Sequence, residues 1–291
     1  MAKVKLITDS AADLSQELYD KYNIAVVPFS ITFDKVRYYR ERLDISNEEF
    51  FEKLKTEKSF PATSLPSIND YIEGIRPFLR QGMDIVCLSI SSKFSGSHQS
   101  AVGAVKELQK EFPDREIIAI DTIQASAGQG VMVLETAKMI AAGMSAKETA
   151  DKLEVIKHTA RVILTIDSLE YLQKGGRIGK VSAIAGTLLN IKPIIIMMNA
   201  ELHPVAKVRG RQKAIERIIK INEEFVGDRK GDYDYLILNA QCYDEAMAVE
   251  QKMKDSGFKL DWPIQDLGVT IGCHTGPSVI GICPIKKFDA E

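Results

Sequence analysis

The sequence contains few of the features that would assign it at once to a common functional class. Its four cysteines form no CxxC pair, which favours reduced thiols in a cytoplasmic protein over a disulfide framework or a zinc site. No apolar run approaches the roughly 18 residues of a membrane span, and the first apolar run, 4–7, is too short for a secretory signal. The net charge of −2 gives no basic surface overall for nucleic acid. We therefore expect neither nucleic-acid binding nor stable membrane insertion.

Motifs for nucleotide binding are incomplete as well. The GxG at 128–130 lacks the third glycine of a dinucleotide fingerprint, because Val133 stands there. A second loop, before 181, superficially resembles a P-loop. However, Lys174 occupies the place of its first glycine, and Val181 occupies the place of its Ser or Thr. The sequence therefore predicts no ATP site at this loop.

The composition is that of a globular protein, with 45% hydrophobic and 27% charged residues. A length of 291 residues suggests about two domains. Short apolar runs are followed by helical patterns, which predicts an α/β fold. One helix is expected to end near Ala142 and another to begin at Ala146. We place the domain boundary near these two helices, which gives domains of residues 1–150 and 151–291.

The most informative stretch is a strand, a polar turn and a helix between Ile85 and Ala101. The apolar run 85–88 predicts a buried strand, and the turn 89–97 that follows is rich in serine. Such turns lie at the carboxyl ends of strands, where α/β proteins bind ligands. Ser95 offers a hydroxyl, and Gly96 lets the backbone approach a ligand. For Ser97 alone a helix cap is the simpler interpretation, but the whole cluster exceeds what a cap requires.

Two prolines hold a second hydroxyl-rich loop in an extended conformation. Pro61 and Pro66 enclose Thr63 and Ser64, and Ser67 is expected to cap the helix that follows. Thr63 and Ser64 are therefore free to face a ligand.

The N-terminal segment leaves two interpretations open. Asp9 and Ser10 follow the first predicted strand, and they either cap the helix 15–22 or contact a ligand. A second strand region is expected at 24–33, with an edge or a terminus at Pro28.

A histidine near the C-terminal end is unlike ordinary core filler. His274 lies between Gly272 and Gly276, and its imidazole can donate a hydrogen bond to a carboxylate or a phosphate. The segment is not a nucleophile elbow, because Ile280 stands where the motif after Ser278 requires glycine.

Two further regions each allow a structural and a functional interpretation. Small residues in 181–189 face the isoleucine-rich segment 191–198, and together they either pack closely or leave an elongated gap. Arg209, Arg211 and Lys213 either form a solvated helix start or contact an anion or a partner protein.

These motifs resemble those of the DegV family, the bacterial fatty-acid-binding proteins, over nearly the whole chain. The similar segments are FSGSHQSA at 94–101, TSLPS at 63–67, KGGRI at 174–178, LNIKPI at 189–194 and IGCHTGPS at 271–278. Two positions depart from the family pattern: Ser278 replaces a usual glycine, and Cys273 replaces a common threonine. Neither change removes a residue that the resemblance assigns to the ligand.

The resemblance implies an N-terminal α/β/α domain with a parallel sheet and a C-terminal α/β domain with a mixed sheet. A long-chain, palmitate-like fatty acid is expected in an apolar tunnel, with its carboxylate between the domains. The residues expected to bind the fatty acid are Thr63, Ser64, Ser95, Gly96, His274 and Thr275. Arg177, together with Arg209, Arg211 and Lys213, is expected to contact an anion or a partner.

By the same resemblance the chain is not itself an enzyme and needs no metal or cofactor. A separate ATP-dependent kinase phosphorylates the bound carboxylate, and the acyl phosphate enters phospholipid synthesis. The alternative is a hydrolase or phosphotransferase that uses His274 and a serine, but the sequence supplies no convincing third member of a triad.

Overall fold

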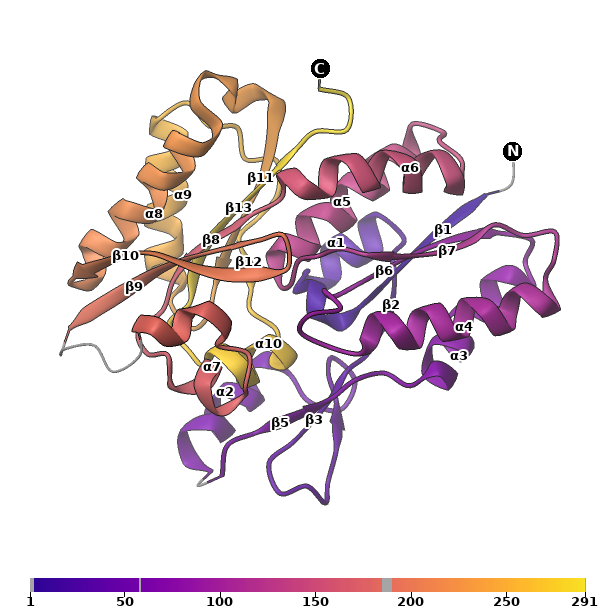
Figure 1. Cartoon of the computed structure of the whole chain (residues 1–291), viewed down its shortest axis with the longest axis horizontal. Helices are drawn as coiled ribbons and strands as arrows, with labels where there is room; N and C mark the ends of the chain where they lie inside the picture. Colours follow the sequence, from indigo (N-terminus) through magenta and orange to yellow (C-terminus); the bar gives the residue numbers. More distant parts are fainter. Residues whose placement is uncertain (1–2, 58, 185–189, 291) are drawn as a thin grey trace.

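The computed structural model describes residues 3–57, 59–184 and 190–290. Its first part contains a four-stranded parallel sheet in the order β2-β1-β6-β7. The strands are β1 (Val4–Asp9), β2 (Ala25–Val27), β6 (Asp84–Ser89) and β7 (Ile117–Asp121). Helices α3 (Ile68–Leu79) and α4 (Ser97–Glu111) cover one face (Figure 1). The other face is covered by α1 (Gln16–Lys21), α5 (Ala127–Ala141) and α6 (Ala146–Ile156). The expected α/β/α arrangement of the N-terminal part is confirmed.

The second part contains a six-stranded mixed sheet in the order β10-β9-β8-β13-β11-β12. Only β11 and β12 pair in parallel among its described strands. The strands are β8 (Val162–Thr165), β9 (Ile191–Met198), β10 (Glu201–Arg209), β11 (Tyr233–Asn239), β12 (Gln265–Asp266) and β13 (Ile280–Lys286). Helices α8 (Arg211–Val226) and α9 (Tyr243–Asp255) cover its outer face. The expected mixed sheet is therefore confirmed.

A third, smaller sheet was not expected from the sequence. It is antiparallel, with the order β4-β3-β5, and consists of β3 (Ser30–Thr32), β4 (Tyr39–Arg40) and β5 (Ala62–Ser64). The segment 24–33 accordingly forms two strands, β2 and β3, which belong to different sheets and are divided at Pro28. Near this sheet lie α2 (Asn47–Thr56), α7 (Glu170–Lys174) and α10 (Val269–Thr275).

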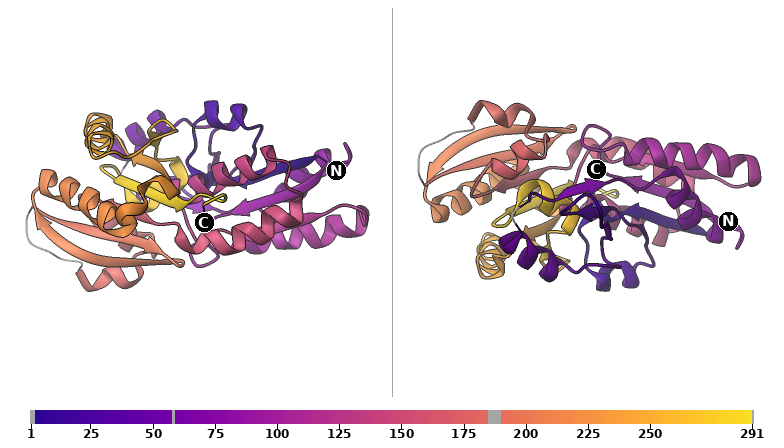
Figure 2. Two further views of the ribbon diagram at one scale, coloured as in Figure 1. Left: turned by 90° about the horizontal axis from the view of Figure 1, so that it is seen from above. Right: turned by 90° about the horizontal axis from the view of Figure 1, so that it is seen from below.

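Helix α5 is buried between the two large sheets. It contacts β1 of the first sheet and β11 and β13 of the second. A side chain at Gly130 would come within 2.5 Å of the Ala12 carbonyl oxygen, and one at Gly128 within 2.5 Å of the Val162 side chain. The small residues of this segment therefore permit close packing on both sides. Figure 2 shows the two large sheets following one another along the molecule, with the C-terminus near its middle.

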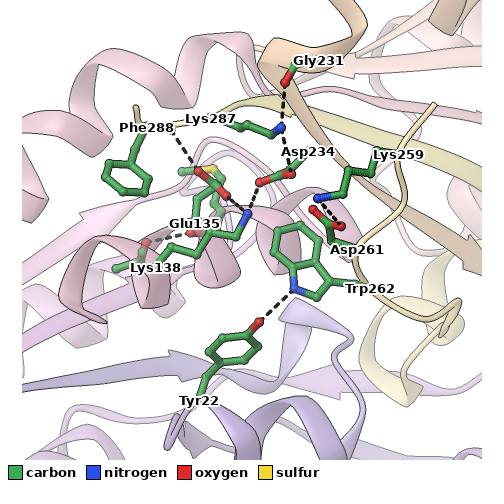
Figure 3. Close-up of polar contacts among 12 residues, drawn as sticks. Tyr22, Glu135, Lys138, Gly231, Asp234, Lys259, Asp261, Trp262, Lys287 and Phe288 are labelled. Carbon is green, nitrogen blue, oxygen red and sulfur yellow. Dashed lines mark hydrogen bonds and ion pairs between the residues drawn. The ribbon is translucent and has the colours of Figure 1, made fainter. Parts of the chain in front are cut away.

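An ion cluster ties the second half of α5 to the six-stranded sheet (Figure 3). Lys138 pairs with Glu135 at 2.9 Å and with Asp234 of β11, and its ammonium lies 4.4 Å from the centre of the Trp262 ring. The Lys287 ammonium lies 4.0 Å from Asp234. We call these groups the Lys138 cluster.

Short 3-10 segments complete the described elements: η1 (Ser10–Ala12), η2 (Lys157–Thr159), η3 (Gly179–Ile184) and η4 (Gly227–Asp232). Residues 185–189, where the sequence suggested a helix beside an elongated gap, lie outside the described residues. The boundary predicted at residue 150 lies within α6 and stays a prediction. In the part of the chain that the structure describes, no helix is both long and apolar enough to cross a membrane.

Candidate functional site

A cavity of about 150 Å³ lies between the inner face of the six-stranded sheet and the loops that follow β6 and β7. On the same measure a single water needs roughly 10–15 Å³, so the space can take a sizeable ligand. Most of its wall is apolar. The apolar lining comprises Phe29, Leu65, Ile90, Phe94, Ala125, Val162, Leu164, Ile166, Leu172, Ile195, Met197, Leu202, Leu238, Leu267, Ile271 and Val279. Its polar lining comprises Thr63, Ser95, Ser126, Arg177, Thr270, His274 and Thr275.

The small sheet and α10 bring the first pair of polar groups together. The Thr63 hydroxyl on β5 and Nε2 of His274 on α10 lie 3.0 Å apart, although 211 residues separate them in the sequence. Gly276 ends α10 with φ of 69°, a backbone conformation that glycine adopts without strain. Beside the imidazole, Gly175 leaves no room for a side chain. Thr63 and His274, each predicted separately to bind the ligand, are therefore in direct contact with each other.

Burial, and secondly the charge of Arg177, lower the pKa of His274 to about 4. The imidazole is therefore neutral near pH 7, with one nitrogen that donates and one that accepts. Its Nδ1 is buried and has no hydrogen-bond partner among the described residues. A neutral imidazole beside a hydroxyl can direct one donor toward a ligand oxygen, and the desolvated surroundings strengthen that hydrogen bond.

The serine-rich turn forms another part of the polar end. Ser95 and Gly96 line the cavity, and the Ser95 hydroxyl accepts a hydrogen bond from the Ser97 amide at 3.2 Å. Gly96 occupies the N-cap position of α4, and a side chain there would lie 3.2 Å from Leu65. The interpretation of Ser97 as a helix cap is wrong, because its hydroxyl donates to the buried Asp9 at 2.8 Å.

Asp9 organises this turn without lining the cavity. Its carboxylate also accepts the Ile90 amide at 3.0 Å and the Gln129 side-chain amide at 2.8 Å. It does not cap α1, since the Ser15 hydroxyl accepts the Leu18 amide there. Asp9 therefore links β1, α4 and α5 to the turn that carries Ser95, a role that its position after a strand left open.

Arg177, from the second part of the chain, also lines the cavity. It is exposed, and its guanidinium donates to the carbonyl oxygens of Phe94 at 3.3 Å and Gly175 at 2.6 Å. This position places a cation beside Ser95 and His274 without an ion pair of its own among the described residues.

The other predicted residues lie in different surroundings. Thr275 lines the cavity, but its hydroxyl donates to the Ile271 carbonyl oxygen at 3.1 Å. Ser64 is exposed and outside the described lining, since neighbouring residues of a strand face opposite sides.

The three basic residues of the 209–213 segment do not form one free surface. Arg209 and Lys213 are exposed, whereas Arg211 is largely buried and pairs with Glu245 at 2.8 Å. None of the three lines the cavity as described.

The cavity also contains polar residues that the sequence did not indicate. The Ser126 hydroxyl donates to Asp13 at 2.6 Å, and the Thr270 hydroxyl donates to Glu41 at 2.7 Å. Both hydroxyls face away from the apolar wall toward buried carboxyls. No period or motif marks Glu41, which lies in a charged and tyrosine-containing segment.

The arrangement suits an amphipathic ligand with one polar end. No carboxylate hydrogen-bonds His274 among the described residues, so the orienting acid of a catalytic triad is missing. Within the same residues, no group of three or more His, Cys, Asp or Glu side chains could hold a metal ion.

Comparison with known proteins gives a consistent picture. The model of the DegV family, described as uncharacterised proteins, matches residues 3–287. A DegV domain-containing protein from Clostridium acetobutylicum is 33% identical over 279 residues, which cover 96% of each chain.

Solved structures are similar over the whole chain. The stearic-acid-binding protein from Eubacterium ventriosum has a TM-score of 0.92 and 32% identity, with 99% of both chains covered. A DegV family protein from Thermus thermophilus, whose structure concerns fatty-acid binding, has a TM-score of 0.89 and 33% identity. That match covers 98% of this chain and 99% of the other.

Proposed function

Because this chain belongs to the DegV family, we propose that it binds one long-chain fatty acid in the cavity between the six-stranded sheet and the loops that follow β6 and β7. The carboxylate lies at Thr63, Ser95 and His274, and the acyl chain lies among the apolar side chains. This proposal rests on one observation: a largely apolar cavity is also lined by a neutral imidazole and by hydroxyl groups. Similar structures that bind fatty acids support it.

The chemistry of the polar end fits a carboxylate. An ionised carboxylate only accepts hydrogen bonds, and the Thr63 and Ser95 hydroxyls and the His274 N–H group can all donate. Each hydrogen bond to a charged group contributes roughly 1.5–3 kcal/mol. Burial of the acyl chain contributes about 0.8 kcal/mol per methylene, so a long chain holds the ligand more strongly than its head does.

The best test is the lipid content of protein purified without detergent. Mass spectrometry of an organic extract should find close to one fatty acid per chain, with a length near that of palmitate. Leu164→Trp fills the apolar wall and should remove most of the lipid. Val205→Trp adds the same side chain at an exposed site on β10 and is the matched control. The proposal would be wrong if wild-type protein contains no lipid and also fails to bind added palmitate and oleate.

A fatty acid held in this way is suited to reaction with a second protein. We propose that a separate ATP-dependent kinase reaches the carboxylate past Arg177. One carboxylate oxygen attacks the γ-phosphorus of ATP, ADP leaves, and the resulting acyl phosphate enters phospholipid synthesis in the cytoplasm. The incomplete nucleotide motifs of this chain support a partner that supplies the ATP site.

Arg209 and Lys213 are the exposed candidates for contact with that kinase. Arg209→Glu combined with Lys213→Glu should keep the fold and the lipid but slow acyl-phosphate formation, with a salt dependence weaker than that of the wild type. Arg211 is left unchanged, because charge reversal there would break its ion pair with Glu245. Lys220→Glu, elsewhere on α8 and exposed, is the control. Normal turnover by the double variant at all salt concentrations would exclude these residues from docking.

A further inference from the structure

The small sheet holds the histidine helix α10 at both of its ends. At the C-terminal end, Thr63 of β5 contacts Nε2 of His274 at 3.0 Å. At the N-terminal end, the Glu41 carboxylate accepts the Thr270 amide at 2.9 Å and the Thr270 hydroxyl at 2.7 Å. Glu41 directly follows β4, which pairs with β3, and β3 pairs with β5. One sheet thus fixes both the position of α10 and the partner of its histidine.

Glu41 is a buried carboxyl group shortly after the exposed segment 34–38 of its hairpin. Only 2% of Glu41 is exposed, whereas Val36, which lies earlier in the same hairpin, is 84% exposed. Its third hydrogen bond comes from the Ser10 hydroxyl at 2.5 Å. Glu41 accepts all three bonds, and these donors oppose the effect of burial, which raises the pKa of its carboxyl.

Asp13 is the second carboxyl group at this point. A side chain at Gly268 would collide with Asp13 Oδ1 and would lie 2.7 Å from Glu41 Oε1, so both oxygens approach the same backbone atom. Gly268 has φ of −74°, which any residue adopts. Its lack of a side chain is therefore required by space. Asp13 Oδ1 is buried without a hydrogen-bond partner among the described residues, and a proton on this carboxyl would relieve the repulsion between the two.

Other charged groups nearby do not neutralise the pair through direct contact. The Arg42 guanidinium donates to the Leu14 carbonyl oxygen at 2.9 Å and to the Gln16 side chain at 2.5 Å. The remaining titratable neighbours, Tyr19, Cys273 and Cys283, are buried, and burial raises the pKa of each further above 7. Glu41 therefore hydrogen-bonds to α10, and it forms no direct ion pair among the described residues.

We propose that Glu41 is a positioning residue for the fatty-acid head: it fixes the start of α10, so that His274 stays in contact with Thr63 and faces the cavity. Its effect on lipid binding rests on the function proposed above. Its effect on His274 does not, because the Thr63–His274 contact exists without a ligand.

The test uses three substitutions in the whole chain. Glu41→Leu removes every acceptor and leaves both Thr270 donors unpaired. Glu41→Gln keeps an acceptor for the Thr270 amide, and its NH₂ group can donate to the hydroxyls of Ser10 and Thr270. Glu49→Leu removes an exposed carboxylate that accepts a capping hydrogen bond from the Ser46 amide at the start of α2, and is the matched control.

The readout is the NMR chemical shift of the His274 imidazole in ligand-free protein, because a loss of stability alone would not change it. In folded Glu41→Leu, the His274 resonances should shift toward those of Thr63→Val, and palmitate affinity should fall roughly tenfold. Glu41→Gln should restore wild-type His274 resonances and an affinity within about threefold, and Glu49→Leu should match the wild type.

Several outcomes decide between the two proposals. Unchanged His274 resonances in folded Glu41→Leu would overturn the positioning role. If that variant does not fold, Thr270→Val, which removes only the hydroxyl donor, takes its place and must shift the His274 resonances. If His274 responds as expected but wild-type protein does not bind palmitate, the positioning role stands and the fatty-acid function fails.

Discussion

Buried carboxyl groups lie near both halves of helix α5, and their charges are balanced in different ways. At the N-terminal end, Asp13 and Glu41 receive hydroxyl and amide donors but no direct ion pair among the described residues. At the other end, Glu135 and Asp234 enclose the Lys138 ammonium. Asp13 and Glu41 contact residues that line the cavity, whereas the Lys138 cluster connects α5 to the six-stranded sheet. The comparison suggests that neutral donors serve the ligand site, whereas compensated charge serves the join between the two parts of the protein.

Removal of the cation should have the largest effect on stability. Lys138→Met leaves the buried Asp234 carboxylate and the neighbouring Glu135 without their cation, and loss of one partner from a buried ion pair costs about 3–5 kcal/mol. We expect urea denaturation to show a loss near the lower limit, because Lys138 is 29% exposed. The folded fraction should still bind palmitate. Lys147→Met removes an exposed pair with Asp151 and should change stability by less than about 1 kcal/mol. Equal losses in the two variants would show that the Lys138 cluster is no stronger than a surface pair.

Changes at the ligand end should act on binding more than on folding. Thr63→Val removes one hydrogen bond to a charged head, worth roughly 1.5–3 kcal/mol, so palmitate affinity should fall about ten- to a hundredfold. Copurified lipid should remain, because the acyl chain is untouched, while acyl-phosphate formation by the cognate kinase should fall. Ser64→Ala, on the exposed side of the same strand, should bind normally. Complete loss of lipid from folded Thr63→Val would contradict the division of roles between head and chain.

The pH dependence of stability should be a smaller difference between the two ends. Burial, followed by the neighbouring Asp234, raises the pKa of Glu135 from its ordinary value to about 8. The folded protein therefore holds this proton more tightly than the unfolded chain does. The stabilising contribution is complete below about pH 4.5 and is lost as the pH rises through about 8. The pKa of Asp234 is lowered and works in the opposite direction.

Glu135→Gln tests this contribution, because glutamine resembles the protonated acid. Urea titrations from pH 5 to 9 should show a flatter profile for the variant than for the wild type. Parallel profiles would mean that Glu135 does not titrate in this range.

The smallest expected effect is the absence of a titration at His274. Since the imidazole pKa is lowered to about 4, it should remain neutral from pH 8 down to pH 5.5. For a histidine, a lowered folded-state pKa means that its contribution to stability is present above about pH 6.5 and is lost as the pH falls toward 4. An NMR titration of ligand-free protein checks this directly, and a midpoint near 6.5 would contradict the described burial.

The sequence predicted the large elements and the main site residues for reasons that the structure makes visible. Apolar runs predicted β1 and β6, and Ser67 predicted the start of α3 as its cap. Thr63, Ser95 and His274 lay in short motifs flanked by proline or glycine. Such motifs carry information about position that an isolated polar residue lacks.

What the sequence could not predict depends on contacts between distant segments. The small sheet has strands of only two or three residues, too short for a period to emerge. Glu41 and Thr270 are 229 residues apart, and neither belongs to a recognisable motif. The role of Asp9 likewise required knowledge of which strand lies beside β1. These residues hold the site in position, and only the folded chain brings them together.

The crystal structure of the palmitate complex would test the central claim most directly. A carboxylate oxygen should lie within hydrogen-bonding distance, about 2.5–3.2 Å, of the Thr63 or Ser95 hydroxyl. The acyl chain should run along Leu164, Ile195 and Met197 of the six-stranded sheet. A carboxylate bound away from Thr63, Ser95 and His274, or an acyl chain outside the apolar cavity, would contradict the account.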